Sequence, residues 1–206
     1  MKISLSDIEA FKIVDRATGE VFYGCSQDWF GTHWQKLSGC GPAAVTNILM
    51  YRNSVKDGSV RDKGTAESLM EEVWKFITPT TKGIPTVEML LERVTSYGEA
   101  RGKITLYRDC VVPREKSMRP SIETVASFID DALGRDAPVA FLNLCNGDEN
   151  TLEDWHWVTV VEMERRASDG RVIVNILDRG RKMPIDLSLW LETTTSDGGF
   201  LHFTFI

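Results

Sequence analysis

The sequence predicts an α+β fold in which a helical first half packs against an antiparallel β-sheet formed by the second half. Apolar residues recur at helical intervals up to about residue 135, whereas short runs rich in Val, Ile, Leu, Phe and Trp follow from about residue 136. This order is typical of α+β proteins, whose helices lie on one side of an antiparallel sheet. No linker rich in Gly, Ser or Pro divides the 206 residues, so we expect one domain at 1–206, with a helical half at about 25–135 and a sheet half at about 136–206.

The first half is expected to begin with a β-hairpin over residues 11–24, where two alternating runs flank the turn Arg-Ala-Thr-Gly. A largely apolar helix then starts at or just after Cys40 and reaches about Tyr51, because a Gly-Pro pair suited to a first helical turn precedes residues spaced at helical intervals. The patterns at Thr65–Ile77 and Pro85–Tyr97 predict two amphipathic helices.

The sheet half follows a short strand at Lys103–Tyr107, a polar loop at Arg108–Pro120 and a helix that starts at Ser121 and ends at Gly134. The Ser-Asp-Gly at 168–170 supplies a hairpin turn between the second and third strands of the sheet. Four apolar runs predict the strands: Ala137–Cys145, His156–Met163, Arg171–Leu177 and Gly199–Ile206.

Composition and charge exclude several classes of protein. The chain is 42% hydrophobic and 26% charged, as soluble globular domains are. Its net charge of −6 opposes binding to phosphate backbones, and no apolar stretch approaches the ~20 residues that cross a bilayer. Asp7 and Glu9 interrupt any secretory signal. We therefore expect a cytoplasmic protein that binds neither nucleic acid nor membrane, and the oligomeric state stays open.

Cys40 is the strongest candidate for a reactive side chain. It lies at the start of a predicted helix, where unpaired N–H groups and the positive end of the helix dipole favour a thiolate. The same N–H groups can bind a developing oxyanion, and a side-chain amide such as that of Gln35 can supply a second donor.

A thiolate nucleophile needs an acid–base partner, and His156 is the best placed of the three histidines. It opens a predicted strand, so its ring can project from the sheet edge toward the helical half. Asp178 ends the next strand, and in a hairpin the start of one strand lies beside the end of the next. The order Cys40, His156, Asp178 therefore predicts a thiolate, an imidazolium and an orienting carboxylate at one place.

The segments Gln35…Cys40-Gly-Pro-Ala-Ala, His156-Trp-Val-Thr-Val-Val and Ile-Leu-Asp178 resemble the papain-like cysteine peptidase superfamily. The likeness is greatest to the bacterial subgroup that includes the double-glycine leader peptidases. It implies a helical lobe carrying the nucleophile Cys40, a sheet lobe carrying the base His156 and the acid Asp178, and a substrate cleft between the lobes. It also implies Gln35 as the oxyanion donor, a peptide or protein substrate, and no metal or cofactor.

The sequence departs from the family pattern at three points. Gln35 precedes Cys40 by five residues instead of the usual six, and Arg179 follows Asp178 where relatives often have Pro. The 22-residue separation of His156 and Asp178 implies a long hairpin loop.

The site predicts a thiol hydrolase, most simply a cysteine peptidase that forms an acyl-enzyme on Cys40. Two alternatives remain open. An acyltransferase would use the same three residues with an amine in place of water, and a catalytically silent member would bind a peptide or partner protein in the cleft.

Several residues also have a structural interpretation. His156 can be a buried, hydrogen-bonded histidine, and Asn175 is a rival to Asp178 as its partner. The Arg179–Lys182 cluster is either a solvated turn or a site that attracts an acidic substrate. Others are expected to be structural or to line the cleft: Cys25, Cys110 and Cys145 as free core thiols, His202 as a structural residue, His33 beside the cleft, and Trp29, Phe30 and Trp34 either packed under a loop or forming a substrate wall.

Overall fold

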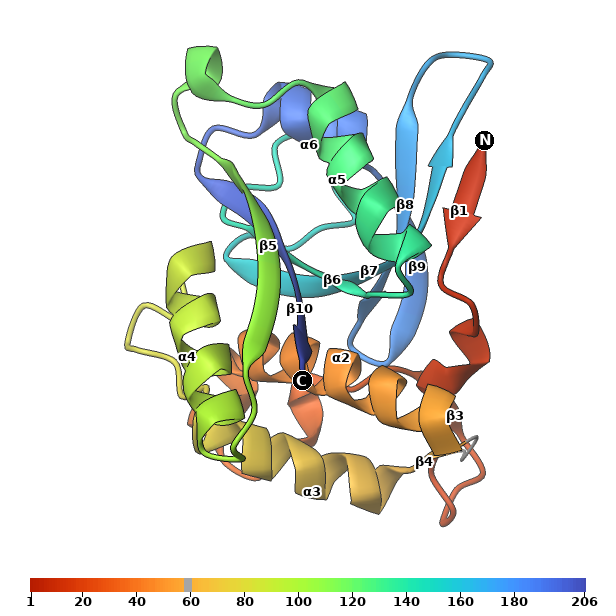
Figure 1. Ribbon diagram of the computed structural model, residues 1–206, viewed down its shortest axis with the longest axis vertical. Helices are drawn as coiled ribbons and strands as arrows, with labels where there is room; N and C mark the ends of the chain where they lie inside the picture. The colour runs from red at the N-terminus through yellow and green to blue at the C-terminus, as the bar shows by residue number, and fades with distance from the viewer. Residues whose placement is uncertain (58–60) are drawn as a thin grey trace.

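The main sheet is antiparallel and has the strand order β5-β10-β6-β7-β8-β9, with β1 pairing with β7 beside this path (Figure 1). The computed structural model describes residues 1–57 and 61–206, and these contain seven strands of this sheet. Their bounds are β1 (Lys2–Ser4), β5 (Thr105–Val112), β6 (Val139–Asn143), β7 (His156–Arg165), β8 (Val172–Asp178), β9 (Arg181–Asp186) and β10 (Gly198–Phe205).

A second, small sheet lies at the N-terminal side. The hairpin predicted over 11–24 is confirmed as β2 (Lys12–Val14) and β3 (Val21–Tyr23), and β4 (Arg61–Asp62) adds to β2 in parallel.

The predicted helices are all present, with small differences in their ends. Those predicted at 40–51, 65–77, 85–97 and 121–134 correspond to α2, α3, α4 and α5, and α2 continues six residues beyond the expected end. Among the described helices, none combines the length and the apolarity needed to cross a membrane. The bounds are α1 (His33–Ser38), α2 (Cys40–Asp57), α3 (Lys63–Trp74), α4 (Val87–Glu99), α5 (Ile122–Gly134) and α6 (Leu187–Thr193).

Helices cover both faces of the sheet, which corrects the expectation that they lie on one side. Val139 and Phe141 of β6 belong to the core cluster that includes α5 and α6, whereas Ala140 and Leu142 belong to the cluster that includes α2 and α4. Successive side chains of a strand point to opposite faces. The uninterrupted apolar run in β6 is therefore the signature of a strand that is buried on both sides.

The helices and strands that the sequence did not predict are α1, α6, β1, β4, β9 and most of β5. The segment Arg108–Val112, expected to be part of a loop, continues β5 and pairs residue by residue with β10. β5 and β9 form the two ends of the strand order, where a strand needs backbone pairing on one side only. Exposed polar side chains such as those of Arg108 and Asp109 are compatible with that position and hide the strand from pattern analysis.

The buried side chain of Asn47 helps to attach helix α2 to β7. The Oδ1 atom of Asn47 accepts a hydrogen bond from the backbone N–H of Cys25 at 2.7 Å, and its Nδ2 donates to Thr159 Oγ1 at 3.2 Å. Asn47 is 3% exposed, so these bonds have no competition from water. The amide thereby joins the N-terminal loop, α2 and the sheet.

We predict that Asn47→Ala lowers the free energy of unfolding by about 1–3 kcal/mol, because it leaves the buried N–H of Cys25 without an acceptor and removes one hydrogen bond of the buried Thr159 hydroxyl. Urea denaturation monitored by tryptophan fluorescence measures the change. Asn53→Ala, on the exposed face of the same helix, is the matched control and should change stability by less than about 0.5 kcal/mol. Equal effects of the two variants would contradict this assignment.

Candidate active site

Cys40 is the first residue of α2, and the glycines on both sides of it are required by close packing. A Cβ atom at position 39 would lie 2.5 Å from the carbonyl oxygen of Gln35, and one at position 41 would lie 2.9 Å from Ile84 Cδ1. A side chain at position 39 would clash with the backbone, whereas one at position 41 would require the end of the Ile84 side chain to shift. The Gly-Cys-Gly sequence thus brings the N-terminus of α2 against its neighbours while leaving the Cys40 side chain partly exposed.

His156 and Asp178 come together because β7 and β8 are adjacent antiparallel strands. His156 is the first residue of β7 and Asp178 the last of β8, and the pairing of Thr159 with Leu177 places them diagonally across the two strands. His156 Nε2 lies 2.8 Å from Asp178 Oδ1. Because Nε2 is engaged there, Nδ1 is the nitrogen left for the hydrogen bond between the ring and Cys40.

The imidazole of His156 is held in its charged form although it is only 4% exposed. Burial on its own lowers the pKa of His156, but hydrogen bonds to Asp178 and Cys40 and the negative charge of both groups raise it to about 10. The ring is therefore protonated throughout the neutral range. A protonated imidazole beside a thiol favours the thiolate.

The structure does not bring Gln35 to this site, which corrects its expected role as oxyanion donor. Its Oε1 accepts hydrogen bonds from the backbone N–H and the hydroxyl of Thr32. The backbone N–H of Gln35 donates to Thr32 Oγ1, which completes the capping box of α1. Its Nε2 donates to Glu71 Oε2 at 2.9 Å. Both ends of the amide are thus engaged away from Cys40.

Gln27 is the side-chain amide that lies beside Cys40, and sequence reasoning missed it. It lines a small cavity of about 10 Å³ together with Cys40, His156 and Asp178. Its Nε2 donates to the carbonyl of Lys36 at 2.7 Å, which leaves the second N–H of the amide available. Its buried Oε1 has no hydrogen-bond partner among the described residues. Helix α1 lies between Gln27 and Cys40 in the sequence, so the two residues are thirteen positions apart.

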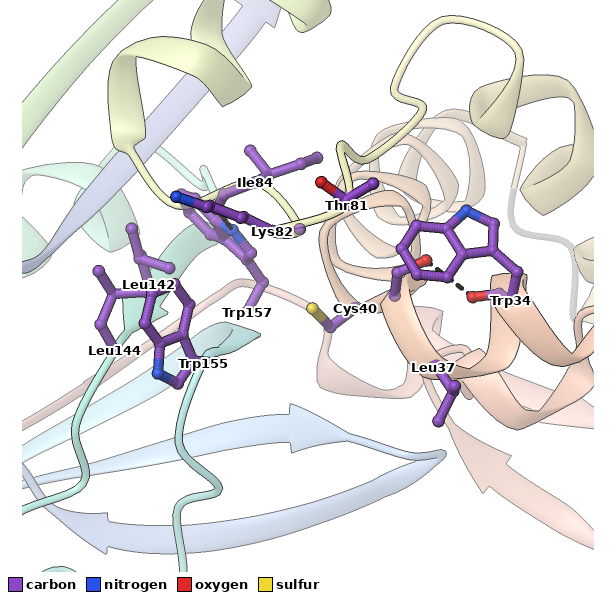
Figure 2. A pocket seen from close by; sticks show the side chains of 12 residues that line it. Trp34, Leu37, Cys40, Thr81, Lys82, Ile84, Leu142, Leu144, Trp155 and Trp157 are labelled. Carbon is purple, nitrogen blue, oxygen red and sulfur yellow. Dashed lines mark hydrogen bonds between the residues drawn. The ribbon is translucent and has the colours of Figure 1, made fainter.

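A cleft of about 280 Å³ opens on the other side of Cys40 (Figure 2). The sulfur of Cys40 points into it, with Trp34 and Leu37 of α1 on one side and Trp155 on the opposite side. Trp155 is 59% exposed and Trp34 43% exposed, so both indoles are open to a ligand. The remaining lining residues are Ser38, Thr81, Lys82, Gly83, Ile84, Leu142, Leu144 and Trp157.

The alternatives raised by the sequence separate clearly in the structure. Asn175 donates to Glu162 Oε1 at 2.5 Å in the middle of β8 and is not the partner of His156. His33 is exposed on α1 and lines neither cavity next to Cys40, and His202 is buried with its ring centroid 5.4 Å from that of Phe128.

The three aromatic residues before the nucleophile divide into two groups. Trp29 packs edge-on against Phe22 and Phe30 against Trp74, as packing under a loop predicts. Trp34 lies on the cleft and is the one that forms a wall.

The four cysteines are free thiols in different environments. Burial raises the pKa of Cys25 and of Cys110. Hydrogen bonding to Thr195 lowers the pKa of Cys145, which makes it the natural competitor of Cys40 for thiol reagents. Within the parts of the chain that the structure describes, no group of three or more Cys, His, Asp or Glu residues has an arrangement that suits a metal ion.

The chain has a papain-like α+β fold, with a helix N-terminus carrying a cysteine packed on an antiparallel sheet that carries a histidine and an aspartate. Nine chains of solved structures match it, among them the crystal structure of UfSP from C. elegans. That match has a TM-score of 0.52 and 9% sequence identity and covers 98% of this chain. At this identity the likeness shows the fold alone.

The chain spans about a third of the UfSP chain, since the match covers 34% of it. The sequence matches no family model and no curated protein. The matches to solved structures therefore extend to the papain-like fold and carry no support for a particular subgroup within it.

We predict that iodoacetamide labels Cys40 fastest of the four cysteines at pH 6–7, well below the ordinary thiol pKa of about 8.5. The reason is the protonated His156 beside it, whose pKa is raised to about 10. In His156→Ala the rate at Cys40 should fall to that of an ordinary thiol and rise only above about pH 8. Peptide mass spectrometry of all four sites measures this, with Cys145 as the internal reference; a Cys40 that never outruns Cys145 would contradict the ion pair.

Proposed function

We propose that the protein is a thiol hydrolase that cleaves a peptide or amide bond through an acyl-enzyme on Cys40. The observation that carries this is the convergence of Cys40, His156 and Asp178 from α2, β7 and β8. These are the nucleophile, base and orienting acid that acyl transfer by a thiol requires. Membership in the leader-peptidase subgroup remains a hypothesis that rests on the Cys-Gly-Pro-Ala-Ala motif alone.

In the first half-reaction the Cys40 thiolate attacks the carbonyl carbon and forms a C–S bond. The oxyanion that develops accepts hydrogen bonds from the side-chain amide of Gln27 and from the backbone N–H at the start of α2. His156 then gives its proton to the leaving amine as the C–N bond breaks, and Asp178 holds the ring in the orientation for that transfer. A thioester on Cys40 and a neutral His156 remain.

In the second half-reaction the neutral His156 takes a proton from water, and the resulting hydroxide attacks the thioester carbon. The C–S bond breaks, the acid product leaves, and the thiolate–imidazolium pair is restored. Because the leaving amine needs the proton of His156, turnover should decrease as the pH rises through about 10, the pKa of that ring.

We predict that Gln27→Ala lowers kcat by about 100-fold, because it removes one donor to the oxyanion. Gln35→Ala is the matched control: it removes the capping box of α1 and costs about 1 kcal/mol of stability, but it should leave kcat unchanged. Hydrolysis of a set of fluorogenic peptide amides measures both, with Cys40→Ala as the blank. A loss of kcat in Gln35→Ala instead of Gln27→Ala would reverse the assignment.

The acyl part of the substrate fits the cleft beside Trp34 and Trp155. The leaving amine must lie next to His156, and that residue lines the small cavity but not this cleft, whereas Cys40 lines both. The walls are mainly aliphatic and aromatic, and Lys82 is the single charged residue among those that line the cleft where the structure describes it. An apolar side chain near an acidic one suits these walls.

We predict that peptide amides with Leu on the acyl side are cleaved at least about 10-fold faster than those with Gly, because the side chain fills the apolar cleft. A neighbouring Glu should be preferred to a neighbouring Lys. Lys82→Glu should invert that charge preference without changing the preference for Leu, when kcat/KM is compared across the four peptides. An unchanged charge preference in Lys82→Glu would remove Lys82 from substrate recognition.

The same assays separate the two other candidate functions. An added amine acceptor that diverts product from the acid to a new amide identifies an acyltransferase. A Cys40 that reacts with no substrate while the cleft still binds peptides, with equal affinity in Cys40→Ala, identifies a silent binding member.

A further inference from the structure

Arg179, the residue directly after Asp178, joins two loops over the candidate active site. Its Nη1 lies 3.0 Å from both carboxylate oxygens of Asp28, and its Nη2 lies 2.9 Å from Glu153 Oε2. Asp28 belongs to the short 3₁₀ helix at Gln27–Trp29, and Glu153 lies three residues before His156. We name this arrangement the Arg179 bridge: Arg179, Asp28 and Glu153.

Both carboxylates of the bridge lie on segments that are themselves fixed. The backbone N–H of Asp28 donates to Ser26 Oγ at 3.2 Å, which caps the 3₁₀ helix. The carbonyl of Glu153 accepts from Nδ2 of the fully buried Asn143 at 2.8 Å. The guanidinium therefore connects two ordered loops.

The backbone is left-handed at two positions that touch the candidate catalytic residues. Trp155, directly before His156, has φ 55°, and Arg179, directly after Asp178, has φ 45°. Among the described residues, Asp136 is the only other non-glycine residue with a positive φ. Such conformations persist where surrounding contacts impose them, and they occur often at functional sites. The bridge supplies such a contact at the second position.

The bridge also closes the space around the imidazole. Arg179 lines the cavity of about 10 Å³ next to Cys40, His156 and Asp178, and its Nε is buried without a hydrogen-bond partner among the described residues. The fork of a guanidinium can hold two carboxylates in fixed directions, which a lysine ammonium cannot do. Because the guanidinium is already paired with two acids, it is poorly suited to attract an acidic substrate.

The Arg179 bridge contributes little to the stability of the fold. The side chain of Arg179 is 36% exposed and those of Asp28 and Glu153 are each 54% exposed, and ion pairs so open to water stabilise a fold little. The position of the bridge indicates a geometric role instead. Arg179 directly follows Asp178 and lines the cavity, and its partner Glu153 lies three residues before His156.

We propose that Arg179 is a positioning residue, which holds Asp178 and the loop before His156 so that the imidazole stays bonded to Asp178 and directed at Cys40. This inference rests on the function proposed for these three residues. The charged groups around the ring are Cys40 from α2 and Asp178 from β8, with the Arg179 bridge at their edge.

The test uses two variants of the full chain, Arg179→Asn and Arg179→Lys. Arg179→Asn removes the guanidinium and tolerates a positive φ, and Arg179→Lys keeps the charge but loses the fork. Arg171→Asn is the matched control, because Arg171 has the same 36% exposed side chain and forms an ion pair with Asp186 at 2.8 Å at the far end of β8. NMR titration of ¹³C-labelled histidine is simple, since the chain has three histidines.

We expect Arg179→Asn and Arg179→Lys each to lower the titration midpoint of His156 by about one pH unit or more, as the contact with Asp178 loosens. The iodoacetamide rate at Cys40 at pH 6.5 should fall about 10-fold in both, and Arg171→Asn should change neither quantity. If the Asn variant does not fold, Arg179→Gly repeats the test with a residue that also accepts this φ.

The opposite results are distinguishable. Loss of a positive charge acting only through space would raise the midpoint of His156, so a rise in Arg179→Asn overturns the proposal, as does full rescue by Arg179→Lys or an unchanged midpoint in both. A parent Cys40 that alkylates no faster than Cys145 refutes the proposed function instead, and the His156 titration then still tests the bridge by itself.

Discussion

The contact between the start of helix α2 and strand β7 is the constraint on which the rest of the site depends. A Cβ at position 41 would be 2.9 Å from Cδ1 of Ile84, in the loop before α4, and 3.5 Å from Trp157 of β7, so the start of the helix packs directly on this loop and this strand. Trp157 is fixed in turn by donating from Nε1 to the carbonyl of Ile84 at 2.8 Å. Further along, Asn47 ties the same helix to Thr159. The thiol of Cys40 and the ring of His156 thus belong to elements whose separation is set by packing, which is how a site is held to sub-ångström tolerance.

A buried positive charge is the second constraint. An imidazolium that is 4% exposed is expensive unless partners compensate, and removing one of them leaves an unpaired charge. Asp178 lies 2.8 Å from the ring, and Cys40 is the second group that raises the pKa of His156. The site is therefore a set of three groups whose charges are mutually required. In the loops around the site, the positive charge of Arg179 is paired with the carboxylates of Asp28 and Glu153, so the guanidinium adds no unpaired positive charge to the cavity.

The sequence predicts those elements of the fold and of the site whose formation depends on local patterns of apolar and polar residues. The helices and the central strands bury apolar faces, so the spacing of apolar residues in the sequence predicts them. The hairpin of β7 and β8 brings His156 near Asp178. Strands β1 and β5 are held by backbone pairing with β7 and β10, which are distant in sequence, and periodicity does not encode a partner. Strand β9 follows β8 in a tight hairpin, but its mostly polar sequence has no alternating apolar pattern. Gln35 belongs to a capping box, and the signature of this motif, Thr32 followed three residues later by Gln35, is present in the sequence. Gln27 and Cys40 line the same cavity although α1 separates them in the sequence. This proximity depends on the tertiary structure and cannot be inferred from local sequence patterns.

A papain-like fold alone does not establish an activity, and 9% identity to UfSP leaves the chemistry to be argued from the site. The contrast between two cysteines supplies that argument. Cys25 and Cys40 line the same small cavity, yet Cys25 is 2% exposed with its sulfur 3.5 Å from that of Met50, an environment in which a thiol is inert. Cys40 instead begins a helix, interacts with a charged imidazole and points into a cleft with two exposed indoles. A purely structural role for Cys40 would require none of these three features, whereas a nucleophile requires a charge partner, a donor for the oxyanion and access for a substrate, and each of these requirements is met by a different element of the fold.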